Sequence, residues 1–303
     1  MTDRLLKFLF RGAPVRGELV RMDESWRAMT AHHDYPAPVR RLLGEMVAAA
    51  ALLASNIKFS GTLIMQLHGD GPVKLLVVEC QSDLAMRATA KLGEDAIGDD
   101  VPLRELVNRN GRGRFAITLD PRDPAPGQQP YQGIVPLEGD TMADVLQYYM
   151  RQSEQLDTRL VLAADADVAA GLLLQKLPEQ GGIAGSVVDE DAWNRATTLA
   201  ATLRREELLA LEPEEIAHRL YSQERLDPQA TLAPRFVCNC SRERIGRMLV
   251  SLGRAEVDSI IEELQTVTVT CDFCGRQYVF DAIDVAQLFA SGRTETADES
   301  QRH

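Results

Sequence analysis

The chain has 303 residues, of which 45% are hydrophobic, and 33 basic against 45 acidic side chains give a formal net charge of −12. This length predicts two domains with smaller pieces between them, and the apolar fraction is sufficient for a sizeable core. The negative charge argues against tight, sequence-independent binding of nucleic acid by the whole chain.

Residues 1–184 are predicted to form an N-terminal core domain. Apolar side chains recur at helical spacing over residues 38–55. Over residues 61–78, two strand-like runs flank the turn sequence His-Gly-Asp-Gly-Pro, which predicts a β-hairpin. Further predicted elements are strands at residues 114–119, 131–137, 158–163 and 169–176, and a helix at residues 141–154. Strands outnumber helices and mostly follow one another, which favours antiparallel pairing, a mixed α/β core and the α+β fold class.

Residues 185–234 are predicted to form a helical linker. An acidic run at residues 189–191 opens one helix, whose apolar stripe extends from Trp193 to Leu203, and residues 212–215 open a second. Both stripes are narrow, and isolated helices shorter than about 15 residues are marginal in water. The linker is therefore expected to be metastable and to depend on packing against the rest of the chain.

Residues 235–290 are predicted to form a small domain that holds four of the five cysteines. Ser241 is a suitable N-cap for the first helix of this domain, and Gly253 a suitable stop. The helices and strands predicted here cover residues 241–253, 257–264, 266–270 and 278–280. Residues 291–303 are small and polar and are expected to be a disordered tail.

We expect no segment of the chain to enter a membrane. The longest apolar run, residues 46–54, is much shorter than the roughly 20 residues that span a bilayer. Residues 1–12 lack the long apolar stretch of a signal peptide. A cytoplasmic location follows, and clustered cysteines in that compartment are expected to be metal-bound or redox-active.

The four clustered cysteines form two tight pairs, Cys238-Asn-Cys240 and Cys271-Asp-Phe-Cys274. The thiolates of such pairs can close on one ion from two sides, and a tetrahedral four-sulfur site with one Zn²⁺ per chain is the usual result. An iron–sulfur cluster is an alternative, although the single-residue spacing of the first pair is less usual there. The same sulfurs can also join as two short-range disulfides. By spacing alone, a permanent zinc site with a purely structural role is the favoured interpretation.

The energetics of a small domain are consistent with a switch at this site. A domain of this size rarely gains more than about 3–5 kcal/mol from its core alone. Structural zinc in small domains contributes on the order of 10–16 kcal/mol of apparent binding energy at neutral pH. Oxidation of the thiolates would therefore remove more stability than the core supplies, unfold the small domain and expose apolar surface there and in the linker.

The remaining residues give no catalytic site. Cys80 ends an apolar run and is expected to be a buried, inert thiol. We identify no grouping of nucleophile, base and acid, so the chain is not expected to be an enzyme.

Segments around the cysteines match a known pattern. They read Cys-Asn-Cys-Ser-Arg-Glu-Arg at residues 238–244, Glu-Val-Asp-Ser-Ile at residues 256–260 and Cys-Asp-Phe-Cys-Gly at residues 271–275. Matching N-terminal segments are His33-Asp-Tyr-Pro36, Gly69-Asp-Gly-Pro72, Tyr131-Gln-Gly133, Leu137-Glu-Gly-Asp140 and Ser153-Glu-Gln155. Over essentially its whole length, the chain resembles the redox-regulated 33 kDa heat-shock chaperone family of bacteria. Asp157 stands where that family leads us to expect proline.

The resemblance implies an ATP-independent holdase that is inactive while reduced and zinc-bound. Peroxide with unfolding heat, or hypochlorous acid, would form the disulfides Cys238–Cys240 and Cys271–Cys274 and release zinc. The second pair would be oxidised first. Unfolding of the linker, formation of a homodimer and binding of unfolded client proteins would follow.

Two other functions remain open. A zinc-ribbon protein that binds nucleic acid would use the same cysteines, but basic and aromatic residues do not alternate near them. A thiol–disulfide oxidoreductase would need one Cys-x-x-Cys pair at a helix N-terminus with a depressed thiol pKa.

Overall fold

The computed structural model describes residues 3–57, 60–124, 129–178, 189 and 191–299. Two compact units make up the chain: an N-terminal unit, Met1–Val237, and a cysteine unit, Cys238–His303. Helices and antiparallel sheets occur in both units, which confirms the α+β class predicted from the sequence.

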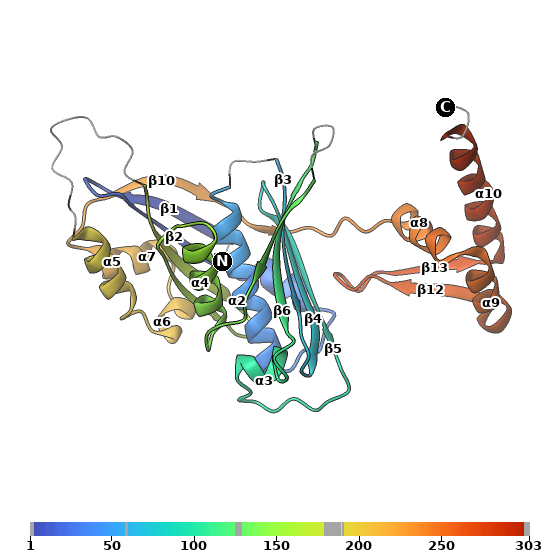
Figure 1. The fold of residues 1–303 in the computed structure, drawn as a ribbon, viewed down its shortest axis with the longest axis horizontal. Helices are drawn as coiled ribbons and strands as arrows, with labels where there is room; N and C mark the ends of the chain where they lie inside the picture. The colour runs from blue at the N-terminus through green and yellow to red at the C-terminus, as the bar shows by residue number, and fades with distance from the viewer. Residues whose placement is uncertain (1–2, 58–59, 125–128, 179–188, 190, 300–303) are drawn as a thin grey trace. The chain divides into compact units, whose positions relative to one another are not determined.

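The first sheet of the N-terminal unit has five strands in the order β10-β1-β2-β9-β8, all antiparallel (Figure 1). Its strands are β1 (Arg4–Phe10), β2 (Val15–Met22), β8 (Thr158–Ala164), β9 (Ala169–Lys176) and β10 (Leu226–Leu232). The pairing of β8 with β9 confirms the two strands predicted there. Strands β1, β2 and β10 were not predicted from the sequence.

The second sheet has six strands in the order β11-β5-β4-β3-β6-β7, with only the short β11 parallel to its neighbour β5 among the described strands. Its strands are β3 (Gly61–His68), β4 (Val73–Gln81), β5 (Ala85–Leu92), β6 (Arg114–Pro121), β7 (Tyr131–Val135) and β11 (Arg235–Phe236). The predicted hairpin is β3–β4, which is confirmed, and β5 extends it by a third strand.

Helix α2 (Ala37–Ala54) lies between the two sheets and contacts strands of both (Figure 1). The predicted helix at this place is confirmed. From Met46 to Ala54 every side chain is buried, and four consecutive alanines keep the helix surface narrow enough for both sheets to pack closely. The other helices before the linker are α1 (Glu24–Thr30), α3 (Leu103–Val107) and α4 (Met142–Gln152).

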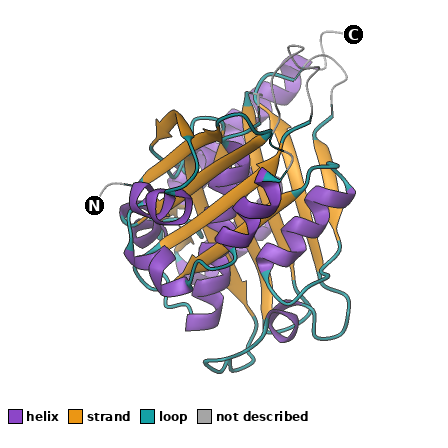
Figure 2. Cartoon of the chain, turned by 90° about the vertical axis from the view of Figure 1, so that its left-hand side faces the viewer, coloured by secondary structure: helices purple, strands orange, loops and turns teal. Residues whose placement is uncertain are grey.

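Linker helices cover the other face of the five-stranded sheet (Figures 1 and 2). They are α5 (Ala192–Ala200), α6 (Arg205–Ala210) and α7 (Pro213–Tyr221). Their buried side chains join those of β1, β2 and β9 in a separate apolar cluster. Part of the predicted linker, residues 179–188 and residue 190, lies outside the described residues.

The linker is not purely helical, because β10 pairs with β1. Pro228 lies in β10 where the register shifts opposite Lys7 and Phe8. Proline has no N–H group for a ladder hydrogen bond and is tolerated at such a bulge on an edge strand. Periodicity along the linker alone could not reveal this strand, because its partner lies more than 200 residues away in sequence.

The cysteine unit consists of three helices and one hairpin among its described residues. They are α8 (Arg242–Leu252), α9 (Arg254–Leu264), β12 (Thr266–Thr270), β13 (Gln277–Asp281) and α10 (Ala282–Glu299). Helix α10 extends through residues 291–299, which were expected to be disordered, and residues 300–303 lie outside the described part. Once the first turns of a helix exist, adding residues is much easier than starting a helix, so a polar segment without proline can continue it.

Glu45 gives a pH-dependent prediction. This half-buried side chain lies on α2, and burial raises its pKa to about 7 against the opposing charges of Arg41 and of Arg205 on α6. Because the folded-state pKa lies above the unfolded value, stability falls as pH rises from the unfolded pKa through about 7. Glu45→Gln should raise the free energy of unfolding by about 1–3 kcal/mol at pH 8.

Urea unfolding at pH 8 and pH 6 measures this effect, and the gain from Glu45→Gln should be about 1 kcal/mol smaller at pH 6. Glu94→Gln, at an exposed position, is the matched control. An equal gain at both pH values would show that desolvation of the Glu45 carboxylate is not the cause.

Candidate metal centre

Both cysteine pairs lie next to regular elements of the cysteine unit. Cys238 and Cys240 immediately precede α8, whose N-cap is Ser241; its Oγ accepts a hydrogen bond from the Arg244 amide at 3.2 Å. Cys271 and Cys274 lie in the turn between β12 and β13. There the Gly275 amide donates to the Cys271 carbonyl at 2.9 Å, with the glycine at a φ of 67° that favours glycine.

The four sulfur atoms converge and lie within 4.8 Å of one another. The Cys238 and Cys271 sulfurs are 3.7 Å apart, and those of Cys240 and Cys274 are 3.4 Å apart. Zinc–sulfur bonds of about 2.3 Å in a tetrahedron place sulfurs about 3.8 Å apart. The observed spacing therefore fits one tetrahedral ion held by four thiolates. Within the described residues, this is the one group of cysteine, histidine and carboxylate side chains that meets the geometry of a metal site.

The environment of the sulfurs differs between the two members of the first pair. Burial raises the pKa of the Cys238 thiol. Partial burial acts in the same direction on Cys240, but hydrogen bonds from Tyr278 and the neighbouring thiols outweigh it and lower its pKa to about 7. Thiols must lose their protons to bind a metal ion, so metal affinity should fall as pH falls.

An apolar cluster surrounds the cysteines. Its buried members are Leu249, Val257, Val267, Cys271, Tyr278, Phe280 and Val285, with the other three cysteines packed against them. Among the side chains of this unit that the structure describes, a cluster of seven buried residues is small for a unit of this length, which implies that the core alone contributes little stability.

Cys80 is not part of the site. It lies on β4 with 0% of its surface exposed, and burial strongly raises its pKa. The thiol therefore stays protonated and out of reach of oxidants, as predicted from the sequence.

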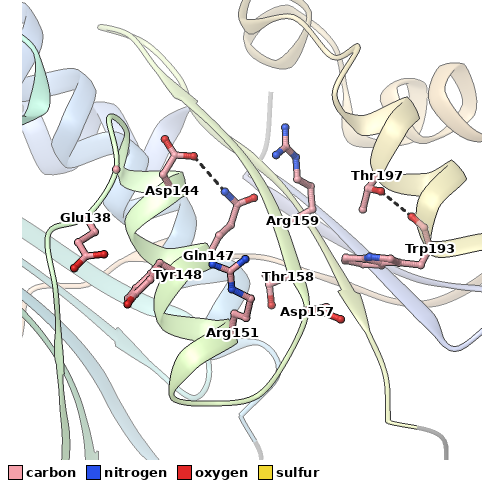
Figure 3. A pocket seen from close by; sticks show the side chains of 11 residues that line it. Glu138, Asp144, Gln147, Tyr148, Arg151, Asp157, Thr158, Arg159, Trp193 and Thr197 are labelled. Atoms are coloured by element: carbon pink, nitrogen blue, oxygen red, sulfur yellow. Dashed lines mark hydrogen bonds between the residues drawn. The ribbon is translucent and has the colours of Figure 1, made fainter.

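A cavity of about 490 Å³ lies in the N-terminal unit, between α4, β8 and the linker helix α5 (Figure 3). Its lining residues are Glu138, Gly139, Asp144, Gln147, Tyr148, Arg151, Asp157, Thr158, Arg159, Trp193 and Thr197. Figure 3 shows Arg151 of α4 and Trp193 of α5 entering it from opposite sides. These residues lie far apart in the sequence, and no motif predicted the cavity. Trp193 and Thr197 of α5 form one wall of the cavity.

Among the helices that the structure describes, none combines the length and the apolar character that a membrane crossing requires.

Comparison with known proteins places the chain in a family. The family model described as Hsp33 protein matches residues 3–281. A 33 kDa chaperonin of Methylobacillus flagellatus is 47% identical over 292 residues, covering 96% of each chain. One of Chromobacterium violaceum is 48% identical over 289 residues, covering 95% of this chain and 94% of its own.

A solved structure shows the same fold. It is the crystal structure of a 33 kDa chaperonin, a heat shock protein 33 homolog, from Thermotoga maritima. The two superpose with a TM-score of 0.78 at 19% sequence identity, over 96% of this chain and 99% of that chain. With the match to the family model over nearly the full length and relatives near 47% identity, the chain belongs to the Hsp33 family.

Proposed function

We propose that the chain is an oxidation-activated holdase chaperone whose sensor is a zinc site formed by Cys238, Cys240, Cys271 and Cys274. The observation that carries the proposal is the convergence of all four sulfurs within 4.8 Å in a unit with a small core. Membership of a family whose relatives are named 33 kDa chaperonin supports the chaperone function.

The cysteines fit zinc by donor type and by spacing. Four soft thiolates at tetrahedral separations suit Zn²⁺, one per chain, in the reduced protein. Bound zinc would supply a cross-link of on the order of 10–16 kcal/mol, compared with about 3–5 kcal/mol from a core of this size. The thiolates therefore hold most of the stability of the cysteine unit.

Each disulfide that forms removes two thiolates from the metal site. With hydrogen peroxide, one sulfur of a pair attacks a peroxide oxygen and becomes a sulfenic acid while water leaves. The second thiol then displaces the hydroxyl group as water, and the disulfide forms. The proposed pairs are Cys238–Cys240 and Cys271–Cys274, and a pair joined in this way no longer has thiolates to offer a metal ion.

The linker connects the sensor to a client surface. Strands β10 and β11 directly precede Cys238 in the chain. Loss of structure at the cysteines would therefore start next to the C-terminal end of residues 185–234, the proposed linker. Helices α5–α7 cover the apolar cluster on β1, β2 and β9. Release of these helices would uncover that surface for unfolded client proteins and for a second copy of the chain. We place this activity in the cytoplasm and assign it no catalytic residue.

One experiment tests the proposal. Zinc content and light scattering of a heat-unfolded client protein are measured with the chain reduced, and again after peroxide treatment at elevated temperature. We expect one zinc per chain to leave and aggregation to be suppressed only after treatment. The control Cys80→Ala should behave like the parent chain, because Cys80 is buried away from the site.

Other results would point elsewhere. Zinc retention with unchanged aggregation would leave a structural metal site. Turnover of a dithiol substrate would indicate an oxidoreductase, and salt-sensitive binding of nucleic acid would indicate a zinc ribbon.

A further inference from the structure

Arg159 of β8 lines the cavity between α4 and α5 and has no partner there. The side chain is partly buried, and its Nε atom is buried without a hydrogen-bond partner. Within the described residues, Arg159 forms no ion pair. Arginine is rarely buried, even in part, unless an oxygen atom pairs with its guanidinium group. The unpaired guanidinium therefore indicates a place for the oxygens of a ligand.

A second arginine faces the same cavity. Arg151 of α4 lines it, and its guanidinium carbon lies 6.0 Å from the centre of the Tyr148 ring. In the part of the chain that the structure describes, Arg151 forms no ion pair either. The planar fork of a guanidinium group matches the oxygens of a phosphate or carboxylate group. Two such forks on adjacent elements can hold one anionic group between them.

Two other polar side chains of the cavity are already engaged. At the start of α4, the Asp144 carboxylate accepts a hydrogen bond from the Thr141 hydroxyl at 2.7 Å. The Gln147 side-chain oxygen accepts one from the Leu160 amide of β8 at 2.9 Å. These bonds fix α4 and its attachment to β8, so a ligand would meet the two arginines in preference to these side chains.

The remaining walls favour a flat ring that carries hydroxyl groups. Trp193 of α5 enters the cavity opposite Arg151 (Figure 3), and an indole face stacks on planar rings. Glu138 and Asp157 also line the cavity and are exposed. Carboxylates accept hydrogen bonds from sugar hydroxyls and repel additional negative charge. The volume of about 490 Å³ lies within the range of about 300–1,000 Å³ that small-molecule sites occupy.

We propose that this cavity binds a nucleoside monophosphate or a similar small phosphate ester with a flat ring. Arg151 and Arg159 bind the phosphate group. Trp193 stacks on the ring, and the carboxylates of Glu138 and Asp157 accept the sugar hydroxyls. The ligand binds without any covalent step. Because α4 and β8 belong to the core and α5 to the linker, bound ligand stabilises the packing of α5 on the core.

Isothermal titration of the full chain, reduced and zinc-loaded, tests the site with AMP as the probe. We expect one AMP to bind per chain, with a Kd below about 1 mM. Adenosine and inorganic phosphate should each bind at least about tenfold more weakly, because each makes only part of the contacts. ATP should also bind more weakly than AMP, because its additional charge meets the exposed carboxylates of Glu138 and Asp157.

Three variants separate the phosphate contact from the ring contact. Arg159→Gln should weaken binding of AMP and of inorganic phosphate about tenfold to a hundredfold, and Arg159→Lys, which keeps the charge and loses the fork, should weaken it less. Trp193→Leu should weaken binding of AMP and leave the affinity for inorganic phosphate within about twofold. Arg114→Gln, the same change at an exposed position on β6, is the control and should bind AMP like the parent chain.

Hydrogen exchange gives a second readout of contact with the linker. With AMP at about ten times its Kd, exchange of the α5 amides, Ala192–Ala200, should slow by about tenfold in the parent chain. The same AMP concentration should have little effect on Arg159→Gln. Unchanged exchange of α5 in AMP-saturated parent chain would place the ligand elsewhere and overturn the proposal.

Other outcomes are equally decisive. Absence of saturable AMP binding, or equal affinities of the parent chain and Arg159→Gln, would overturn the site. Inorganic phosphate that binds as tightly as AMP would overturn the assignment of a ring-bearing ligand. If Arg159→Gln does not fold, Arg159→Lys decides, and a parental affinity for AMP in that variant would exclude a two-pronged guanidinium contact. None of these results depends on the metal centre or on the response to oxidants.

Discussion

A chain carrying Cys271→Ser is expected to lose the metal and the fold of the cysteine unit while the N-terminal unit stays folded. Cys271 contributes one of the four converging sulfurs and is itself part of the apolar core of that unit. Loss of one thiolate removes much of the metal-binding free energy, which is on the order of 10–16 kcal/mol, and a core contribution of about 3–5 kcal/mol does not replace it. Cys274→Ser should act in the same way.

Zinc stoichiometry measures the loss of the metal. Hydrogen exchange, resolved by peptide, measures the loss of the fold of the cysteine unit. Amides of β12 and β13 should lose protection, whereas those of β3 and β4 should keep it, because the sheet and α2 form a core that includes none of the four clustered cysteines. Cys80→Ala is the matched control and should retain full zinc. A Cys271→Ser chain with full zinc and the parental response to peroxide would show that these cysteines are not the sensor.

Tyr221→Ala is expected to activate the reduced chain without release of zinc. Tyr221 lies at the end of α7 with 1% of its surface exposed, and its ring packs edge-on against Phe10 at 5.0 Å. Its hydroxyl donates to the Ala196 carbonyl of α5 at 3.4 Å, so one side chain ties two linker helices to the sheet. Truncation of a buried aromatic residue costs about 3–5 kcal/mol, more than short helices can replace by other contacts.

Light scattering of a heat-unfolded client protein, with zinc measured in parallel, tests the activation. Phe115→Ala is the matched control, because Phe115 is equally buried but packs in the core around α2, away from the linker. Only Tyr221→Ala should suppress aggregation while reduced. Equal suppression by both variants would mean that general unfolding, and not release of the linker, exposes the client surface.

Polar contacts between β2 and the linker helices are consistent with the proposed release of the linker. Arg21, 8% exposed, lies 3.3 Å from Asp23 and 3.8 Å from Glu212, and it donates to the Leu209 carbonyl. The Arg21 Nε and single oxygens of both carboxylates are buried without a hydrogen-bond partner. Incompletely paired buried charges add little net stability. This contact therefore contributes more to the orientation of the linker helices than to the free energy of their packing on the sheet.

Local patterns predicted the elements whose partners are close in sequence. The hairpin β3–β4 follows from alternation around a glycine- and proline-containing turn, and α2 follows from an apolar run with helical spacing. The cysteine spacing predicted that the four sulfurs converge, because the two members of each pair lie in one short segment. A local pattern cannot predict pairing between segments that are distant in the sequence. Residues 226–232 form the strand β10 because they pair with β1.

The sequence alone therefore determined the α+β class, the four-sulfur site and the family, since these depend on residue type and short spacing. Tertiary structure decided which surface the linker covers and which side chain reaches the Cys240 sulfur. Tyr278 is 38 positions from Cys240, and only the pairing of β12 with β13 and the packing of α8 bring them within 3.1 Å. Contacts of this kind depend on the register and packing of separate elements, and single-segment patterns carry no information about either.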